Sequence, residues 1–322
     1  MERSTRIAAT GTWALSDGRA GNARQAQSLA FALDLGATDR ILHPRAPWSW
    51  LAPRWLPGAS TAAFGHGFEA ALAHPPALAI GCGRQAALAT RLLRRRGAAT
   101  VQILDPRIAP SHWDLVVAPI HDDVHGDNVV EVLGSLNPVN DLWLARMRAD
   151  FTEPGQLQGP RIALFIGGPT RHASFDTIAV TGWLGAIAAA LDRSGGSLML
   201  CASRRTPPAM RSWLRQRHAA MPGIHWLDDS DGANPYPGVL GWADAIVCSP
   251  DSVNMLSEAC ATRAPVFVAD PGRATGRIRS FIDMLASQHR IRALDDVLAP
   301  FTVEPLRETS RVAAEVRARL AL

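Results

Sequence analysis

The sequence predicts an α/β protein made of two doubly wound domains, each built on a parallel β-sheet. Near-continuous apolar runs rich in β-branched residues alternate with stretches of helical periodicity, and this βαβ pattern occurs twice along the chain. A break rich in glycine and proline, residues 148–160, separates the two series. The length of 322 residues also exceeds what one typical core accommodates.

The apolar runs give the expected strands in chain order. The first domain has strands at 11–16, 76–82, 100–104 and 114–120, and the second has strands at 161–167, 197–203, 244–249 and 265–270. In the stretch NARQAQSLAFAL one apolar face recurs at helical spacing, formed by Ala26, Leu29, Ala30 and Leu33. We expect domains at 1–150 and 151–300, and a terminal amphipathic helix within 301–322 that can pack back on the first domain.

The composition indicates a soluble globular protein, since 47% of the residues are hydrophobic and 19% are charged. No apolar run has the length of a transmembrane helix, and the N-terminal segment lacks the apolar region of a secretory signal. The cysteines are scattered without metal-ligand spacing, and most lie in apolar runs, as reduced thiols do; they are Cys82, Cys201, Cys248 and Cys260. These features predict a cytoplasmic protein.

The chain has no lysine, so arginine supplies every cation other than histidine, and the net charge is +4. A guanidinium group binds phosphates and carboxylates through two parallel hydrogen bonds, so such a surface suits those ligands. The basic run RLLRRRG, residues 91–97, closes a helical pattern and carries no interleaved aromatic residues. We therefore interpret it as a helix end and expect no nucleic-acid partner.

Open α/β sheets bind ligands beyond the carboxyl ends of their strands, so the segments that follow strands are candidate sites. In SDGRAGNARQA, residues 16–26, Gly18 and Gly21 permit a tight turn before a helix N-terminus. Asp17 stands where a general base can act. The segment lacks the GxGxxG pattern, so a nicotinamide cofactor is not favoured. A glycine turn needed only for packing is the alternative.

Two further segments combine glycines, hydroxyl groups and arginines after a strand. GGPTRHASFD, residues 167–176, offers Gly168, Thr170 and Arg171, and SRRTP, residues 203–207, offers Ser203, Arg204 and Arg205. Glycines let the backbone approach a ligand closely, and the hydroxyl and guanidinium groups bind phosphate oxygens. Phosphate binding is the preferred interpretation, and solvated helix caps are the alternative.

The stretch CSPDSVNMLSEACATRAPVFV, residues 248–268, predicts a strand that ends at Ser249 and a helix that begins near Asp251 and Ser252. Helical spacing predicts a polar stripe formed by Asp251, Asn254 and Glu258, opposite a buried stripe formed by Val253, Leu256 and Cys260. The helix N-terminus suits a diphosphate, and a carboxylate two turns later can accept hydrogen bonds from a ribose diol.

The chain resembles known families in these segments. The Ser-rich helix start with S-E-A and A-P-V-F-V resembles the nucleotide-sugar half of glycosyltransferases with the B-type, twin-Rossmann fold. SDGRAGNARQA, GCGRQAAL, QILDPR, DLVVAPIHD, IGGPTRH, SRRTP and SPDSVNMLSEA together resemble the elongated-mitochondria (mitochondrial fission) family over nearly the whole chain. The resemblance implies two Rossmann-like domains that face a cleft. Plant members promote organelle division, and some bacterial members are described as nucleotide-sugar epimerase-like.

The glycosyltransferase resemblance also implies roles for individual residues. It places Glu258 at the ribose of a nucleoside diphosphate sugar donor, with Ser249, Asp251 and Ser252 near the diphosphate or sugar. Arg171 and Arg204 would neutralise phosphate charge, and Arg205 would do the same or face solvent. Such enzymes stabilise the leaving diphosphate with helix dipoles and basic side chains, so no metal or other cofactor is expected. The candidate bases of an inverting transfer are Asp17, which is preferred, His121 and Asp122.

The segment HDDVHGD, residues 121–127, crowds two histidines and three aspartates behind an apolar strand. It can be a divalent-cation site, a loop that contacts substrate, or a polar turn that caps the next helix. No spacing here matches a recognised metal-binding loop, so a substrate loop is preferred. His121 and Asp122 lie nearest the strand end and are the expected functional pair.

The segment PWSWLAPRWLPG, residues 47–58, contains Trp48, Trp50 and Trp55. Burial in a connection between elements is the preferred interpretation. If exposed, the tryptophans suit the interfacial zone of a membrane, and the protein would then meet a lipid-linked acceptor at the inner face of the membrane.

Three hypotheses about function follow. The first is a metal-independent glycosyltransferase that acts on a cell-envelope glycan or lipid. The second is a nucleotide-sugar epimerase on the same fold. The third is a non-catalytic relative that serves as an interaction platform.

Overall fold

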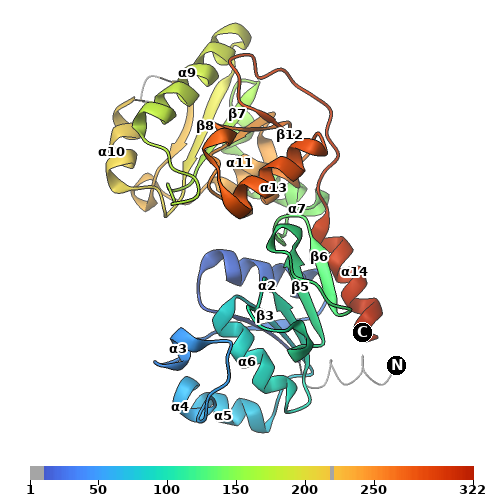
Figure 1. Ribbon diagram of the computed structural model, residues 1–322. Coiled ribbons are helices and arrows are strands. Elements are labelled where there is room, and N and C mark those ends of the chain that lie inside the picture. The colour runs from blue at the N-terminus through green and yellow to red at the C-terminus, as the bar shows by residue number, and fades with distance from the viewer. Residues whose placement is uncertain (1–10, 218–220) are drawn as a thin grey trace. The chain divides into compact units, whose positions relative to one another are not determined.

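The computed structural model describes residues 11–217 and 221–322; residues 1–10, part of the segment examined for a secretory signal, lie outside them. The chain divides into two compact units, shown in Figure 1. Unit 1 extends to Pro138 and includes Arg307–Leu322, and unit 2 is Val139–Leu306. No helix within the described residues is long and apolar enough to cross a membrane.

Unit 1 contains a parallel six-stranded sheet in the order β2-β1-β3-β4-β5-β6. Its strands are β1 (Thr12–Ser16), β2 (Ala37–Ile41), β3 (Leu78–Cys82), β4 (Ala99–Ile103), β5 (Leu115–Pro119) and β6 (Val129–Val132). The inner strands β3, β4 and β5 are buried along their whole length, whereas the edge strand β2 is exposed at every residue. Strands buried on both faces need helices on both faces of the sheet.

Helices cover both faces of the unit 1 sheet. On one face α2 (Ala20–Ala32) and α14 (Glu308–Leu320) share a core that includes Leu29 and Val316. On the other face α5 (His66–Ala73) and α6 (Arg84–Arg94) contribute Phe68 and Leu88 to a second core. Two short helices, α3 (Trp48–Leu51) and α4 (Thr61–Phe64), precede α5 in the connection from β2 to β3.

Unit 2 contains a parallel six-stranded sheet in the order β12-β11-β10-β7-β8-β9. Its strands are β7 (Arg161–Ile166), β8 (Ser197–Ala202), β9 (Gly223–Trp226), β10 (Ala245–Cys248), β11 (Val266–Val268) and β12 (Ile291–Ala293). The chain proceeds from β7 outward to β9, then returns to the other side of β7 and proceeds from β10 outward to β12. This is the doubly wound order, and it confirms the predicted fold class in both units.

The helices of unit 2 also lie on both faces of their sheet. α9 (Thr177–Ser194) and α10 (Pro208–Arg217) bury Trp183, Ile187 and Leu214 in one core. The other helices are α7 (Asp141–Asp150), α8 (Glu153–Gln156), α11 (Tyr236–Trp242), α12 (Val253–Cys260) and α13 (Gly276–Ser287). Figure 1 shows α9 and α10 on one side of β7 and β8, with α11 and α13 on the other.

The division of the chain differs from the predicted boundary at residue 150. The structure assigns α7 to unit 2, where the Arg148 side chain donates to the carbonyl of Gly241 at 3.0 Å. Next to α7, the Trp242 indole donates to the carbonyl of Phe151 at 2.7 Å. The terminal helix α14 returns to unit 1 and packs against α2 and β6. The Pro- and Gly-containing break at 148–160 thus begins inside a helix of the second unit.

Candidate functional site

The carboxyl edge of the unit 2 sheet has a reversal in strand order between β7 and β10. Loops that follow two such strands lead to opposite sides, which leaves a crevice where ligands of doubly wound folds bind. The loop after β7 begins with Gly167 and Gly168, and the loop after β10 contains Ser249, Asp251 and Ser252. The strand order therefore brings two of the predicted segments to one place.

Asp251 connects these two loops. Its side chain is fully buried and accepts hydrogen bonds from the Gly168 N–H at 3.0 Å and the Ser249 hydroxyl at 2.6 Å. The Ser249 hydroxyl oxygen in turn accepts the Gly167 N–H at 2.8 Å. The guanidinium of Arg205 forms an ion pair with the same carboxylate at 2.6 Å. The buried charge is thus matched by a cation and two hydrogen-bond donors, as burial requires.

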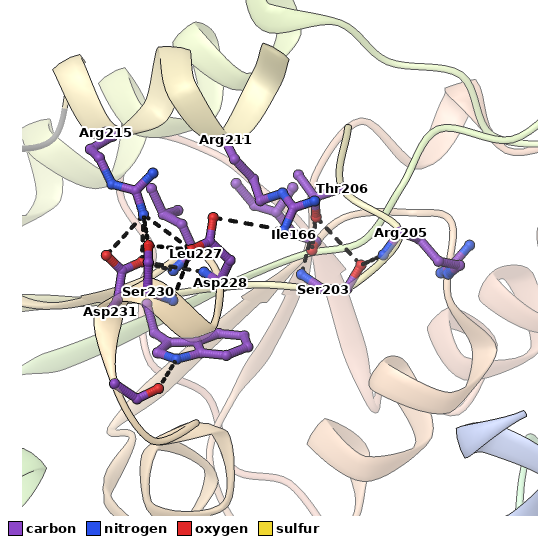
Figure 2. Close-up of polar contacts among 12 residues, drawn as sticks. Ile166, Ser203, Arg205, Thr206, Arg211, Arg215, Leu227, Asp228, Ser230 and Asp231 are labelled. Carbon is purple, nitrogen blue, oxygen red and sulfur yellow. Dashed lines mark hydrogen bonds and ion pairs between the residues drawn. The ribbon is translucent and has the colours of Figure 1, made fainter. Parts of the chain in front are cut away.

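The loop after β8 is attached to the end of β7 by Thr206, as Figure 2 shows. Its buried hydroxyl lies 3.0 Å from the carbonyl of Ile166 and 2.6 Å from the carbonyl of Gly167, and it accepts the Ser203 N–H. Ser203 then accepts the N–H of Arg205 at 3.1 Å. These bonds fix the backbone that presents Arg205 to Asp251.

Both glycines after β7 are required by close packing. A Cβ on Gly167 would lie 2.2 Å from the Asp251 carboxylate, and a Cβ on Gly168 would lie 2.2 Å from the carbonyl oxygen of Arg205. Real Cβ atoms do not approach so closely, so any other residue would displace the loops. Both glycines are needed for close contacts within the protein. The sequence alone does not distinguish this need from the close approach of a ligand.

The predicted phosphate-binding groups therefore fall into two sets. The Gly168 N–H and Arg205 are bonded to Asp251. Arg204 is exposed and makes no hydrogen bond or ion pair with another described residue. Thr170 accepts N–H groups of its own turn, and the exposed Arg171 contacts the neighbouring His172. Of the predicted cations, Arg204 and Arg171 thus have no carboxylate partner among the described residues.

Helix α12 begins as predicted, with Ser252 as its N-cap accepting the N–H of Met255 at 3.3 Å. Asn254 is half-buried on the first turn. The predicted polar stripe is wrong at Glu258, because this side chain is only 4% exposed. The hydroxyl of Tyr236, the single tyrosine of the chain, donates to Glu258 at 2.5 Å. The ribose-binding role of Glu258 stays a prediction, and one of its oxygens already has a protein donor.

Sequence reasoning missed Tyr236 and the loop after β11. Ala173, in the loop after β7, pairs with Ala274, and the N–H of Thr275 donates to the carbonyl of His172 at 2.7 Å. Asp270 has a left-handed backbone, with φ of 43°, and accepts the Trp183 indole N–H at 3.0 Å. The position of this loop directly after a predicted strand was the available signal.

The unit 1 sheet has its own reversal in strand order, between β1 and β3, and Asp17 follows β1 there. The Asp17 carboxylate, 12% exposed, accepts hydrogen bonds from the Asn22 amide at 2.9 Å and the Arg19 N–H at 3.2 Å. Burial, and then the nearby Asp17 charge, raise the pKa of the Cys82 thiol well above its usual value. Cys82 is therefore a neutral neighbour of Asp17.

Gly18 and Gly21 take different positions in this turn. Gly18 adopts a φ of 77° in the exposed turn itself, a conformation that favours glycine, whereas Gly21 is half-buried within α2. The first residue of α2 is Ala20, and its N-cap, Arg19, provides no side-chain hydrogen bond.

His121 and Asp122 lie in a short 3₁₀ turn at the end of β5, and both are half-buried. Three strand spacings, ~14 Å in total, separate β5 from β1, so these side chains and Asp17 belong to different places along the edge. The interpretation as a cap for the next helix is wrong, since the segment leads into strand β6. Within the described residues, no group of three or more His, Cys, Asp or Glu side chains is arranged to hold a metal ion.

The tryptophan segment is only partly buried. Trp48 packs against the core formed by α5 and α6, whereas Trp50 is 72% and Trp55 is 46% exposed. Arg95 lies over the Trp55 ring at 5.5 Å from its centroid. The preferred interpretation of burial is therefore wrong for two of the three tryptophans.

Sequence comparisons identify relatives over most of the chain. A family model described as mitochondrial fission ELM1 matches residues 20–320. The mitochondrial fission protein ELM1 of Arabidopsis thaliana is 25% identical over 276 residues, which cover 76% of this chain and 64% of the plant protein. The uncharacterized protein RP120 of Rickettsia prowazekii (strain Madrid E) is 23% identical over 350 residues, covering 95% of this chain and 97% of that protein.

Solved structures are similar to the chain in fold. The UDP-GlcNAc 2-epimerase of Methanocaldococcus jannaschii, in complex with UDP-GlcNAc and UDP, has a TM-score of 0.55 at 12% identity and covers 97% of this chain and 100% of its own. The S. aureus MnaA–UDP structure has a TM-score of 0.53 at 12% identity and covers 97% of each chain. The calicheamicin glycosyltransferase CalG4 has a TM-score of 0.52 at 12% identity and covers 97% of this chain and 98% of its own. The chain thus has the B-type, twin-Rossmann fold of such proteins.

Proposed function

This chain belongs to the mitochondrial fission ELM1 family, and from that premise we propose that it is a glycosyltransferase whose second unit binds a nucleoside diphosphate sugar. The observation that carries the proposal is the constellation at the carboxyl edge of β7, β8 and β10. There Asp251 holds three loops together, and Arg204 and Arg171 stay exposed without a carboxylate partner among the described residues. Fixed loops beside a strand-order reversal, with guanidinium groups that have no carboxylate partner among the described residues, suit a diphosphate.

Charge stabilisation is the chemistry that these groups supply. Breaking the bond between the sugar and a nucleoside diphosphate leaves negative charge on the departing phosphate. Arg204 and Arg171 provide cations at that place, and the N-terminus of α12 adds partial positive charge. In this proposal the arginines take the part that a bound metal ion takes in other transferases, and the donor sugar nucleotide is the substrate.

The proposed base is Asp17, in unit 1. A base must reach the acceptor hydroxyl by a hydrogen bond, directly or through one water, and Asp17 keeps a partly exposed carboxylate at the reversal between β1 and β3. Asn22 and the backbone of Arg19 orient it. His121 and Asp122 lie three strands away and would contact a different part of a large acceptor.

The proposed acceptor is a cell-envelope glycan or lipid, which the protein meets by peripheral contact with a membrane. Trp50 and Trp55 supply exposed indole rings for the interfacial zone, whereas Trp48 supports the segment from within. Replacing both exposed tryptophans by serine should reduce co-sedimentation with anionic vesicles. Unchanged co-sedimentation would refute this contact without bearing on the donor site.

A thermal-shift screen against nucleoside diphosphates and their sugars tests the proposal. A ligand that binds only the folded protein raises the melting temperature, so the correct nucleotide should do so at millimolar concentration. Arg204→Gln should weaken its binding about tenfold or more, because a charge-assisted hydrogen bond contributes about 1.5–3 kcal/mol. Arg217→Gln, at an exposed position on α10, is the matched control.

The same screen separates the alternatives. No response to any nucleotide would contradict both enzymatic functions and favour an interaction protein. If a donor responds and is converted in the absence of an acceptor, the chain is a nucleotide-sugar epimerase instead. Glu258→Ala should remove the response if Glu258 holds the ribose, and unchanged affinity would refute that role.

A further inference from the structure

A cavity of about 430 Å³ lies in unit 1 between the β1–β2 edge of the sheet and α5. Its apolar walls are formed by Trp13, Leu15, Leu42, Phe64 and Phe68. The volume falls in the range of small-molecule sites, ~300–1,000 Å³. None of the residues given a role in the proposed reaction lines this cavity.

The polar side chains that line the cavity are all basic. The guanidinium of Arg40 lies 4.8 Å from the centroid of the Trp13 ring, and the exposed side chains of His43 and His74 also line the cavity, so these three residues form a basic rim. No carboxylate lines the cavity. Glu69, the acidic residue of α5, lies outside the lining and accepts the hydroxyl of Thr61 at 2.8 Å. Apolar walls with a basic rim complement a ligand that joins an apolar body to an anionic group.

Ile41 connects the cavity to the loop that carries Asp17. This residue lines the cavity and is 60% exposed, and its Cγ2 lies 3.1 Å from the position that a Cβ on Gly18 would take. The N–H of Leu42 donates to the carbonyl of Ser16 at 2.8 Å. A ligand in the cavity would therefore lie beside the turn of the proposed base.

The connection that forms one side of the cavity has an unusual surface. Between β2 and β3, Trp50 is 72% exposed, Trp55 46% and Leu51 40%, and Glu69 is the one acidic residue. Exposed large apolar side chains with few carboxylates favour contact with an anionic lipid surface over a nucleotide or free sugar.

We propose that this cavity binds an anionic amphiphile, with the phosphate of a long-chain alkyl or prenyl phosphate at Arg40 and the start of its chain against Trp13 and Phe68. The assignment rests on the proposed function, because it names the lipid part of the acceptor and places it next to Asp17. It concerns residues of unit 1 alone, so it can be tested separately from nucleotide binding.

Dodecyl phosphate, titrated below its micelle-forming concentration into the full chain in a calorimeter, is the probe. We expect it to bind at least about tenfold more tightly than dodecyl maltoside, which has the same chain and a neutral head, or inorganic phosphate, which has no chain. Equal affinity for the two dodecyl compounds would overturn the proposal, because the basic rim would then play no part.

Two variants localise the binding. Ala70→Phe places a ring in the cavity from an exposed position on α5, and Arg40→Gln removes the cation at the rim. Each should weaken dodecyl phosphate binding about tenfold or more. The controls are Ala73→Phe, exposed on the same helix but outside the lining, and Arg54→Gln, also exposed and outside it. Unchanged affinity in both cavity variants would overturn the proposal.

The nucleotide thermal shift, measured on the same variants, separates this inference from the proposed function. Both cavity variants should keep the nucleotide response, since that site lies in unit 2. If dodecyl phosphate binds with the expected variant pattern but no nucleotide binds, the proposed function fails and the cavity assignment stands. If a nucleotide binds and dodecyl phosphate does not, the cavity assignment fails alone.

Discussion

Asp251 illustrates how one buried carboxylate can hold the loops of a candidate site together. It accepts the Gly168 N–H, the Ser249 hydroxyl and the Arg205 guanidinium. Asp251→Ala should lower the free energy of unfolding by about 2–3 kcal/mol, because it leaves buried donors without acceptors. Asp251→Asn, which keeps one acceptor oxygen, should fall between the wild type and the alanine variant. Urea unfolding measures both changes.

Arg205→Ala is the matched comparison for Asp251. The arginine side chain is 49% exposed, so water can replace part of its ion pair. We expect Arg205→Ala to lower the free energy of unfolding by no more than about 1 kcal/mol. A loss as large as that of Asp251→Ala would contradict the view that the carboxylate, rather than the ion pair, holds the loops.

Gly168 gives a steric test of the same loops. A Cβ at this position meets the backbone of Arg205, so Gly168→Ala should destabilise the protein by about 1–3 kcal/mol. The control is Gly182→Ala, in the exposed part of α9, where a Cβ meets nothing within 4 Å. That change should stabilise the protein by about 0.5–1 kcal/mol, since alanine favours helix over glycine. Thermal unfolding distinguishes the two signs.

The lowered pKa of Asp231 predicts how the stability of the protein depends on pH. Burial would raise the pKa of this carboxyl, but hydrogen bonds from Arg215 and from the N–H groups of Leu227 and Asp228 outweigh it and hold the pKa below its usual value. Figure 2 shows this cluster at the end of β9. A lowered pKa in the folded state stabilises the protein above the ordinary value of about 3.9. That contribution is lost as the pH falls further, through the folded-state pKa.

Asp231→Asn should therefore be less stable than the wild type near neutral pH, and the difference should shrink as the pH falls below about 4. Urea unfolding at a series of pH values measures the difference. Asp229→Asn, an exposed position in the same turn, is the control and should run parallel to the wild type. A deficit for Asp231→Asn that is constant with pH would contradict the assignment.

Among the elements, α12 depends on a residue that is distant in sequence. Arg290 is 4% exposed and donates to the carbonyls of Cys260 and Thr262, at and beyond the last turn of α12, both at 2.9 Å. A cation at a helix C-terminus stabilises it through unpaired carbonyls and the helix dipole. Arg290→Met should lower the free energy of unfolding by about 2–3 kcal/mol.

Arg279→Met is the control for Arg290. Arg279 forms an ion pair with Asp283 on the surface of α13. Arg279→Met should therefore lower the free energy of unfolding by no more than about 0.5 kcal/mol. Equal losses in the two variants, measured by urea unfolding, would show that the buried guanidinium adds nothing to α12.

The strands that the sequence predicts are the inner strands of each sheet. Edge strands bury fewer side chains and so lack a continuous apolar run. β2, β6, β9 and β12 are the edges of the two sheets, and none of them was predicted. The clearest case is β2, whose residues ATDRI are all exposed. The pattern of apolar and polar residues thus identifies the inner strands of a parallel sheet and gives no signal for its edge strands.

Strand order, unlike strand position, decides which candidate residues meet. Each loop that follows an inner strand could be located from the sequence, but not its neighbours across the sheet. Asp251 and Gly168 meet because β10 pairs with β7, and His121 is distant from Asp17 because β3 and β4 lie between their strands. The burial of Glu258 depends on Tyr236, which belongs to another element. Pairings between residues that are distant in the sequence produce no local pattern in it, so they could not be predicted.

The order of the chain does not keep the two compact units separate. Unit 1 is completed by the last helix, α14, after the chain has built all of unit 2. Val312, Ala313, Val316 and Leu320 of α14 are buried in the core shared with α2. Arg317 also donates to the carbonyl of Ala32 at 2.8 Å. Unit 1 should therefore depend on residues at the far end of the sequence.

Val316→Ala tests this dependence, because Val316 is fully buried and its loss should destabilise unit 1 by about 2 kcal/mol. Hydrogen–deuterium exchange should then quicken in β1, β3 and β4, with little change in β7 and β8. Leu214→Ala, in the core of unit 2, is the mirror variant and should quicken exchange in β7 and β8 instead, at a cost of about 3 kcal/mol. If either variant loosened both sheets equally, the two units would unfold as one. The nucleotide response and the dodecyl phosphate response would then have to be interpreted as properties of a single cooperative body.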